Sequence, residues 1–485
     1  MAVDKLVDSG ALDTGLTSIA DKIRSRSGGS NQLAFPTGFV SEIDNIPQGG
    51  GGAVEEKDVN FYDYDGTLVD SYTAAEFLAL SSMPANPTHT GLTAQGWNWS
   101  LADAKAFVQD NGALDVGQNY ITDDEKTRIY VTLNEETLSP VLHFSLSGTA
   151  TVDWGDGTTE SVTGSSNYTN IARPHTYNSA GDYIITIYDI TVKAFLGDAW
   201  VSGSVYGCLM SSNQNAVYYH IPYMATITRI ELGKNMACGH YMAYRAYNLE
   251  AITIPTTGMS LCAQNMVENC YNLKCIIIPN GVNTVSQHSL WNSGLEKIIF
   301  PKTITTFNSG VMTNCTRLEK IVLPDGIDMN QQTFVNCSYL RKVIIPSNVR
   351  QPGGQNFQQC SNLKEIHLPS AWTNIPANMF MNCNRLSNIT IHEGITNINA
   401  SAFSADYSLT KITIPSTVTN IGAGAFSGSW NIKEYHLKPT TPPTLTSTNS
   451  LDVQADCIIY VPAGSLEAYQ TATNWSTYAS KMQEE

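Results

Sequence analysis

The stretch Asn248-Leu-Glu-Ala-Ile-Thr-Ile-Pro255 returns as Asn272-Leu-Lys-Cys-Ile-Ile-Ile-Pro279. The pattern continues down the chain, and self-similarity at a fixed period is the signature of a repeat architecture. The sequence therefore predicts a solenoid in which each unit forms one rung. The leading apolar residue of the units recurs at steps of 22 to 24 residues, at Ile227, Leu249, Leu273, Leu295, Leu318, Leu340, Leu363, Leu386, Leu409 and Ile432.

Other side chains repeat in the same register, which indicates that whole units stack on one another. A cysteine stands three residues before the leading position in five units, at Cys270, Cys315, Cys337, Cys360 and Cys383. A large apolar residue stands six before it, at Met312, Phe334, Phe357, Phe380, Phe403 and Phe426. Each unit reads x-Leu-x-x-Ile-x-Ile-Pro, a short strand with alternating faces that a proline ends. Stacking then builds one continuous core, in which we expect the cysteines as reduced, small apolar residues.

This pattern resembles the BspA-like leucine-rich repeat, Phe-x-x-Cys-x-x-Leu-x-x-Ile-x-Ile-Pro, over about residues 215–440. The cysteine is replaced at Ser293 and Asp406, and the proline is replaced at His392. The tail at 441–485 looks like the strand-and-helix cap that closes such solenoids, because the last repeat would otherwise expose its core. The resemblance implies a binding function without catalysis.

The first 47 residues predict a helical docking segment. Apolar residues recur at helical spacing from Leu12 to Ile23, and a second short helix ends at Pro47. The stretches Leu16-Thr-Ser-Ile-Ala-Asp-Lys-Ile-Arg-Ser25 and Leu33-Ala-Phe-Pro-Thr-Gly-Phe39 are similar to the N-terminal segment of structural proteins in phages of Gram-positive hosts. A glycine-rich linker follows at 48–57.

Two more segments precede the solenoid, which we place at 192–440. Residues 58–123 predict a small α+β module, with a hairpin turn at Asp65-Gly66 and a helix that begins near Ser100. Residues 124–191 contain Trp154-Gly-Asp-Gly157 and resemble a polycystic-kidney-disease (PKD) domain, which implies an immunoglobulin-like β-sandwich.

The run Asp63-Tyr-Asp65-Gly-Thr-Leu-Val-Asp70 matches the first motif of haloacid-dehalogenase phosphatases. In that family the first aspartate attacks phosphate and the second acts as acid and base. The chemistry also needs Mg²⁺, later acidic residues, a lysine and a doubly wound sheet. No alternating strand and helix units separate Asp63 from Asp123-Asp124, so we favour a hairpin turn over an enzyme.

Several other residues have a structural and a functional interpretation, and we favour the structural one for each. His367 and His436 sit at repeat-strand positions, where exposed strand residues are expected. Aromatic residues could stack on sugar rings but are more often core residues, and calcium could bind carboxylates that a turn explains equally well. The aromatic candidates are Trp97, Trp99, Tyr241, Tyr244 and Tyr247, and the calcium candidates are Asp153 and Asp156.

Charge and composition indicate which classes of partner are not expected. The chain has 27 Lys and Arg against 43 Asp and Glu, a net charge of −16. Nucleic acids and anionic membrane surfaces select for basic patches, so we expect neither as a partner. The N-terminus lacks the apolar stretch of a secretory signal, and no run of about 18 apolar residues predicts a membrane span.

Together these features predict a multidomain, mainly β chain with short N-terminal helices, a small α+β module, an immunoglobulin-like sandwich and a capped leucine-rich-repeat solenoid. We expect a non-enzymatic virion protein of a phage or phage-like particle. The N-terminus would bind other virion proteins, and the solenoid would bind a protein or polysaccharide on the host surface. The alternatives are a capsid decoration or head-fibre protein and a bacterial adhesin. A homotrimer is possible for a fibre component, and we assign no catalytic residue, cofactor or metal ligand.

Overall fold

The computed structural model describes residues 56–197, 209–211, 221–256 and 261–485. The chain divides into two compact units, Met1–Glu55 and Glu56–Glu485. The predicted docking segment and most of the predicted linker therefore lie outside the described residues. None of the helices in the described part has the length and apolar character needed to cross a bilayer.

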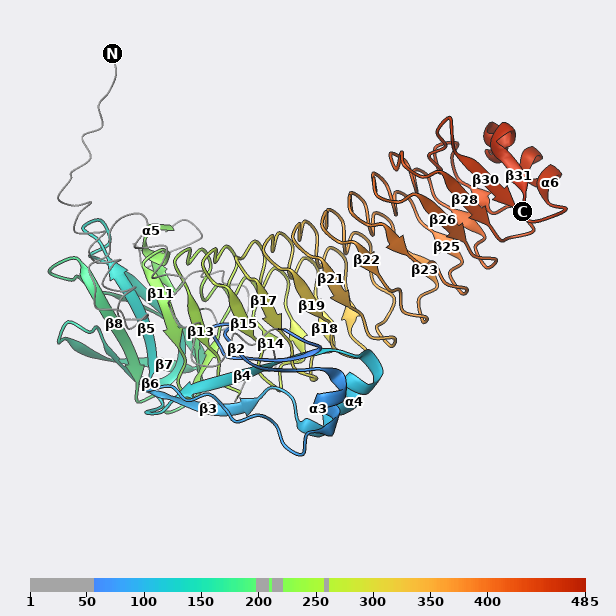
Figure 1. Ribbon diagram of the computed structural model, residues 1–485. Helices are drawn as coiled ribbons and strands as arrows, with labels where there is room; N and C mark the ends of the chain where they lie inside the picture. The colour runs from blue at the N-terminus through green and yellow to red at the C-terminus, as the bar shows by residue number, and fades with distance from the viewer. Residues whose placement is uncertain (1–55, 198–208, 212–220, 257–260) are drawn as a thin grey trace, which may run out of the picture. The chain divides into compact units, whose positions relative to one another are not determined.

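The repeats form the predicted solenoid, and its short strands pair in parallel in two ladders (Figure 1), of which the sequence predicted only the Leu-x-x-Ile strands. Neighbouring strands pair in parallel at equivalent repeat positions, for example Ile276 with Ile298 and Ile412 with Tyr435. The first ladder holds the Leu-x-x-Ile strands: β11 (Ile227–Glu231), β13 (Ala251–Thr253), β15 (Cys275–Ile277), β17 (Lys297–Ile299), β19 (Lys320–Val322), β21 (Lys342–Ile344), β22 (Glu365–Ile366), β24 (Asn388–Ile389), β26 (Lys411–Ile414), β28 (Glu434–Leu437) and β30 (Ile458–Val461). The second holds β12 (Met236–Cys238), β14 (Leu261–Cys262), β16 (Thr284–Val285), β18 (Thr306–Phe307), β20 (Asp328–Met329), β23 (Asn374–Ile375), β25 (Asn397–Ile398), β27 (Asn420–Ile421) and β29 (Thr444–Leu445).

The repeated apolar residues fill the interior in columns. All ten leading residues, from Ile227 to Ile432, are at most 1% exposed. The phenylalanine column is a stack of near-parallel rings, with centroids 5.3 Å apart for Phe334 and Phe357 and 5.2 Å apart for Phe403 and Phe426. One apolar cluster extends from Ile129 to Met482, so the rungs share a single core.

The cysteine column lies inside the solenoid with all of its thiols free. Each thiol donates a hydrogen bond to a main-chain carbonyl of the preceding repeat, for example Cys337 Sγ to Met312 O at 3.2 Å and Cys360 Sγ to Phe334 O at 3.2 Å. Burial raises the pKa of the Cys315 thiol to about 11, which keeps it protonated as a donor. Cysteine thus satisfies one carbonyl per rung while adding little volume.

The turns before the leading position use left-handed backbone. Asn314 and Asn336 have φ values of 62° and 57°, a region that asparagine enters more easily than most side chains. Their amides form a ladder, in which Asn336 Nδ2 donates to Asn314 Oδ1 at 2.9 Å. Asparagine at this position therefore fixes both the turn and the contact between repeats.

The segment predicted as a sandwich continues directly into the solenoid. Its strands are β5 (Thr127–Leu133), β6 (Val141–Asp153), β7 (Thr159–Pro174) and β8 (Gly181–Tyr188). Strands β9 (Ala194–Leu196) and β10 (Met210–Ser211) and helix α5 (Ile221–Met224) follow in the range that the sequence placed in the solenoid. Strand β5 pairs with β11 and β9 pairs with β12, so one hydrogen-bonded sheet joins this segment to the first repeat. The first rung is therefore covered by these strands. The immunoglobulin-like topology itself stays a prediction.

Residues 58–123 form a four-stranded sheet with two helices. The sheet order is β2 (Leu68–Tyr72), β1 (Val59–Tyr62), β4 (Leu114–Thr122), β3 (Leu92–Trp97). Helix α3 (Ala74–Ala79) begins with a capping box at Thr73, and α4 (Leu101–Asn111) is capped by Ser100. The predicted hairpin is present as β1 and β2, in which Gly66 has a φ of 89°.

The C-terminal residues add α6 (Leu466–Thr471), the 3₁₀ helix Trp475–Lys481 and β31 (Met482–Glu484) to the end of the solenoid. Tyr469 and Trp475 are fully buried, and both donate side-chain hydrogen bonds to main-chain carbonyls of the preceding loop, at Pro439 and Pro443. The last repeat therefore has apolar residues packed on its end. The predicted role of 441–485 as a cap, and the predicted boundaries at 123, 191 and 440, stay predictions.

Asp406 replaces cysteine in the core, and it lies in the interior with 0% exposure. Its Oδ1 accepts from the Cys383 amide at 2.7 Å, while its Oδ2 has no hydrogen-bond partner. Burial raises the pKa of this carboxyl well above its usual value. Since ionisation in the core is unfavourable, the folded state holds a proton that the unfolded chain releases near pH 4.

We therefore expect Asp406→Cys to stabilise the protein at neutral pH, by about 1–3 kcal/mol for removal of an unpaired buried polar atom. The gain should shrink as the pH falls towards about 4, where the unfolded aspartate is also protonated. Denaturant unfolding at several pH values measures both effects. The reciprocal control, Cys360→Asp two repeats earlier, should lose stability over the same pH range, and a pH-independent difference would contradict the argument.

Candidate functional site

The outward face of the first ladder is divided into an apolar part and a polar part. The residues four positions after the leading leucine are Ile277, Ile299, Val322 and Ile344, and the first three are at most 8% exposed. In the next three repeats the same position holds His367, Thr390 and Thr413, all of them exposed. The side chains therefore change from apolar to polar between β21 and β22.

The α+β module covers the apolar part. Its strand β4 lies against β13, β15 and β17, and the blue elements in Figure 1 cross these strands. Val322 and Ile344 pack with the module core around Phe61, Phe77 and Phe107. The module is therefore docked on the solenoid, and the apolar outward residues are its docking surface.

Side-chain hydrogen bonds to the solenoid backbone fix the position of the module. Trp99 Nε1 donates to Phe300 O at 2.8 Å, and Asn98 Nδ2 donates to Ile278 O at 3.3 Å. Asn119 Nδ2 donates to Ile277 O at 3.2 Å. These donors bond main-chain carbonyls at the ends of the repeat strands, where the module buries them.

The docked surfaces also approach closely because one of them lacks a side chain. A Cβ atom at Gly117 would lie 2.5 Å from Ile277 Cγ2. Only glycine allows β4 to pack this tightly on β15. The close approach makes Gly117 a specific determinant of docking.

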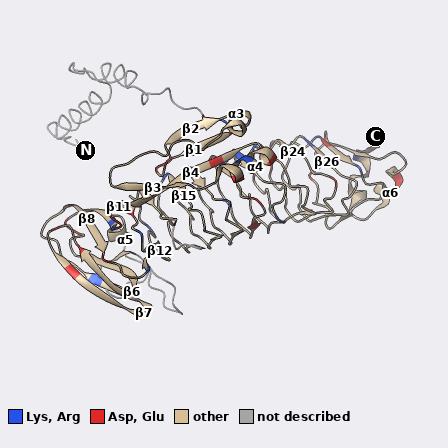
Figure 2. Cartoon of the chain, turned by 90° about the horizontal axis from the view of Figure 1, so that it is seen from below, with Lys and Arg blue, Asp and Glu red and all other residues tan. Residues whose placement is uncertain are grey.

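Ion pairs surround this interface. Lys320 Nζ and Asp115 Oδ1 are 2.7 Å apart and their side chains are 12% and 10% exposed, while Lys297 pairs with Glu56 at a more exposed position. Lys302 pairs with Asp103 and lowers the pKa of that carboxyl. Figure 2 shows acidic and basic residues next to one another beside α4. Charge complementarity therefore adds to the specificity of docking.

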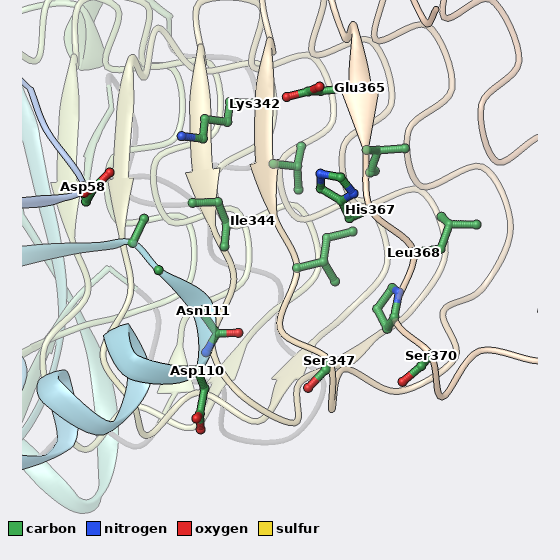
Figure 3. Close-up of a pocket in the computed structure, with 16 residues that line it drawn as sticks. Asp58, Asp110, Asn111, Lys342, Ile344, Ser347, Glu365, His367, Leu368 and Ser370 are labelled. Atoms are coloured by element: carbon green, nitrogen blue, oxygen red, sulfur yellow. The ribbon is translucent and has the colours of Figure 1, made fainter. Parts of the chain in front are cut away.

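A groove of about 600 Å³ lies where the module ends and the open part of the sheet begins. Figure 3 shows the end of α4 with Asp110 and Asn111 on one side and His367 of the following repeat on the other. Ile344 and Leu368 form part of its apolar floor. The remaining polar groups on its wall are Asp58, Lys342, Ser347, Glu365 and Ser370.

The open part of the sheet continues from the groove across β22, β24, β26 and β28. Along β22, β24 and β26 the outward side chains are polar and exposed: Glu365, His367, Asn388, Thr390, Lys411 and Thr413. We call these six residues the open face. Three strands at a spacing of about 4.8 Å make it roughly 10–15 Å wide across the ladder.

The open face ends at His436, which is 8% exposed. Its Nε2 lies 2.9 Å from Glu434 Oε2 and its Nδ1 lies 3.0 Å from Glu485 Oε1. Its ring stacks on Tyr460 with centroids 4.6 Å apart. This histidine therefore ties Glu485 to β28, and the prediction that it is exposed is wrong because these contacts cover its ring. His367 is exposed, as predicted from its strand position.

The residues of the phosphatase-like motif build a turn. Asp63 Oδ1 accepts from the Tyr64 amide at 2.8 Å, and Asp65 Oδ1 accepts from the Thr67 amide at 2.9 Å. Asp63 Oδ2 lies 2.6 Å from His89 Nε2. The sheet around them mixes parallel and antiparallel neighbours and is not doubly wound. Asp70 accepts from the Tyr72 hydroxyl, so these carboxylates serve local structure.

The aromatic candidates have structural contacts. Trp99 is 5% exposed and Trp97 Nε1 donates to Pro84 O at 2.9 Å. Tyr241 is 8% exposed and packs edge-on against Tyr244. Tyr247 stacks on Tyr271 of the next repeat, with centroids 5.1 Å apart, so it belongs to the surface rather than to the core.

The calcium candidates hold the turn after β6. Asp153 Oδ1 accepts from the Gly155 amide at 2.9 Å, and Asp156 Oδ1 accepts from the Thr158 amide at 3.0 Å. Asp156 Oδ2 also lies 2.8 Å from His175 Nε2. Among the described residues there is no group of three or more side chains suited to hold a metal ion.

Sequence reasoning missed the docking of the module, although a signal was present. The outward position is Ile277, Ile299, Val322 and Ile344 in four successive repeats and polar in the next three. An apolar run on a face that would otherwise meet water indicates a covered surface. Its partner residues, Trp99 and Gly117, lie about 160 to 200 residues earlier and follow no repeat of their own.

The parallel ladders and interior columns define a leucine-rich-repeat solenoid. Residues 237–360 and 327–442 match the model of the BspA type leucine rich repeat region. The resemblance seen in the sequence is thus confirmed, and residues 237–442 are a BspA-type repeat region.

Several solved leucine-rich-repeat structures are similar to parts of the chain. A protein from Bacteroides ovatus is 16% identical, with 64% of this chain and 90% of that chain covered and a TM-score of 0.35. A leucine rich cell surface protein from Faecalibacterium prausnitzii is 18% identical, with 53% and 83% covered and a TM-score of 0.33. A protein from T. pallidum is 21% identical, with 33% and 77% covered and a TM-score of 0.30. A comparison with curated protein sequences gave no match.

Docking of the module predicts unequal effects at one repeat position. Ile277→Ala should loosen the module, at a cost of about 2–4 kcal/mol for a buried isoleucine. Thr413→Ala, the same position on the open face, should change stability by less than about 0.5 kcal/mol. Hydrogen exchange of β1 and β4 measures the effect. Equal protection of these strands in both variants would show that the outward isoleucines do not hold the module.

Proposed function

We propose that this chain is a non-enzymatic recognition protein whose open face binds a macromolecule on a bacterial cell surface. The observation that carries the proposal is the change in the outward column, apolar under the module and polar beyond it. A sheet face that is built from exposed polar side chains on a stacked core is a surface that can vary without loss of the fold.

The shape of this region favours a large ligand. The open face is bordered by α4 on one side and by the C-terminal residues around His436 on the other, which leaves a wide strip with the groove along one edge. Strips of this kind suit a chain or an extended surface, whereas small-molecule sites are enclosed and mostly apolar. We therefore place the principal contact on β22, β24 and β26.

The absence of an enzymatic role is part of this proposal. The motif with Asp63 is engaged in a hairpin turn, and its histidine neighbour His89 contacts the same carboxylate. The acidic residues beside the groove, Asp58 and Asp110, stand with no nucleophile and base in hydrogen-bond contact among the groove residues. A role in binding accounts for these acidic residues without a catalytic reaction.

Two kinds of structure could carry the protein, a phage or phage-like particle and a bacterial cell. A phage or phage-like particle is favoured by the resemblance of residues 1–47 to phage structural proteins, with the solenoid directed at the host. A bacterial cell surface is favoured by the BspA-type repeats of residues 237–442. A capsid decoration protein uses the same architecture at another place on the particle.

A bulky side chain in the centre of the open face should block binding. Thr413→Trp is expected to weaken binding of the full-length protein to cells at least tenfold, because an indole there would hold a ligand away from the strands. Flow cytometry with labelled protein measures this, using cells of the bacterium that carries the gene, or of the host if a virus carries it. Thr163→Trp on the exposed side of β7 is the matched control and should bind normally. Equal binding by both variants would show that the open face is not the surface that binds the ligand.

Immunogold electron microscopy with antibody against residues 215–440 distinguishes the carriers. We expect gold at the tail tips of particles in a lysate. Gold on capsids would assign the protein to decoration. Labelled cells without labelled particles would contradict the assignment to a phage particle and would favour a bacterial adhesin.

A further inference from the structure

Exposed aromatic residues gather at one edge of the solenoid. The turn between the cysteine column and the leading leucine column forms this edge, and we call it the rim. It carries Tyr271, Tyr339, Tyr407 and Trp430, which are 43%, 53%, 39% and 60% exposed. Large aromatic side chains are normally buried, and their grouping along one edge is not explained by the core.

The rim residues Tyr407 and Trp430 border the open face. Tyr407 stands four residues before Lys411, the first residue of β26 on the open face, and Trp430 stands four residues before Glu434, the first residue of the next strand, β28. Their ring centroids are 5.4 Å apart and the rings are tilted by 36°. The two rings therefore form a continuous aromatic surface across two neighbouring repeats.

The backbone of this part of the rim is held in place. Asn431 Nδ2 donates to Tyr407 O at 2.7 Å, and Ser408 Oγ donates to Asn384 O at 2.7 Å. Each bond joins one repeat to the preceding one. The backbone that carries the two rings is thus preorganised, which lowers the entropic cost of binding.

We propose that the rim and the open face together bind a linear polysaccharide, with sugar rings stacked on Trp430 and Tyr407. This inference rests on the proposed recognition function and names its ligand class. The electron-rich face of an indole or phenol ring attracts the C–H groups on the apolar face of a pyranose. The hydroxyl groups at the edge of the sugar then face Lys411 and Thr413.

The composition of the open face favours a glycan over a protein. Protein interfaces have an apolar centre with a polar margin. Here the centre is polar, with Asn388, Thr390 and Thr413 exposed on neighbouring strands, and the aromatic groups stand at the margin. Side-chain amides and hydroxyls can both donate and accept, which suits a ligand whose surface is covered with hydroxyl groups.

The repeat spacing favours a linear chain. Neighbouring strands are about 4.8 Å apart, which is close to the length of one sugar unit in an extended polymer. Further rings stand on the same edge at Tyr339 and at the stacked pair Tyr247 and Tyr271. A polymer that follows the rim would therefore meet aromatic surfaces at more than one place.

Treatment of the cells identifies the ligand class. Full-length protein is tested on intact cells, on cells digested with proteinase K, and on cells oxidised with mild periodate, which cleaves the vicinal diols of sugar rings. We expect binding to survive the protease and to fall at least tenfold after periodate. Binding lost to protease and retained after periodate would overturn the polysaccharide and leave the recognition function intact. No binding to intact cells would contradict the recognition function itself.

Substitutions at Trp430 test whether the rim contacts the polysaccharide. Trp430→Ala should lower binding to protease-treated cells at least tenfold, and Trp430→Phe should restore most of it, because an aromatic face is kept. Thr316→Ala, at the equivalent rim position of another repeat, is the control and should bind normally. An unchanged melting temperature shows that Trp430→Ala is folded. Normal binding by Trp430→Ala would overturn the role of the rim.

Discussion

Each strand of the solenoid has two faces, and only the inward face is satisfied by the stacking of repeats. Columns of leucine and isoleucine, together with phenylalanine and cysteine on most rungs, fill the interior, as the burial of Leu340 and Leu363 shows. The outward face must meet either water or another part of the chain. The position of the module follows from this requirement. The apolar residues Ile277, Ile299 and Val322 must be covered, whereas the polar residues Thr390 and Thr413 can stay in contact with water.

The sequence predicts the interior well because the interior is periodic. A register that places Leu273, Leu318 and Leu386 at one position needs no knowledge of distant contacts, and all three are fully buried. The docked module follows no such rule. Its contact through Trp99 and Phe300 joins residues that are 201 positions apart. The hydrophobic core of the module is small and includes residues of the solenoid. Pairing of this kind depends on the shape of two finished surfaces, which local pattern does not encode.

The candidate site was hidden from sequence reasoning for a related reason. The groove has one wall from Asp110 and Asn111 at the end of α4 and the other from a repeat strand. Neither wall is unusual by itself. The site exists only because the module stops at β21, so the residues on the open face could be chosen only after the module was placed.

Stacking also explains how the solenoid can carry a varied surface. Asp406 interrupts the cysteine column with a buried carboxyl, yet Phe380, Phe403 and Phe426 stack without a gap on either side. Repeat proteins distribute stability over nearest-neighbour interfaces, so one weak rung costs only a local share. Exposed positions such as Thr413 and Trp430 contribute less to these interfaces than the columns do. The exposed residues can therefore vary while the columns beneath them hold each one at a fixed spacing, and the proposed recognition function depends on this property.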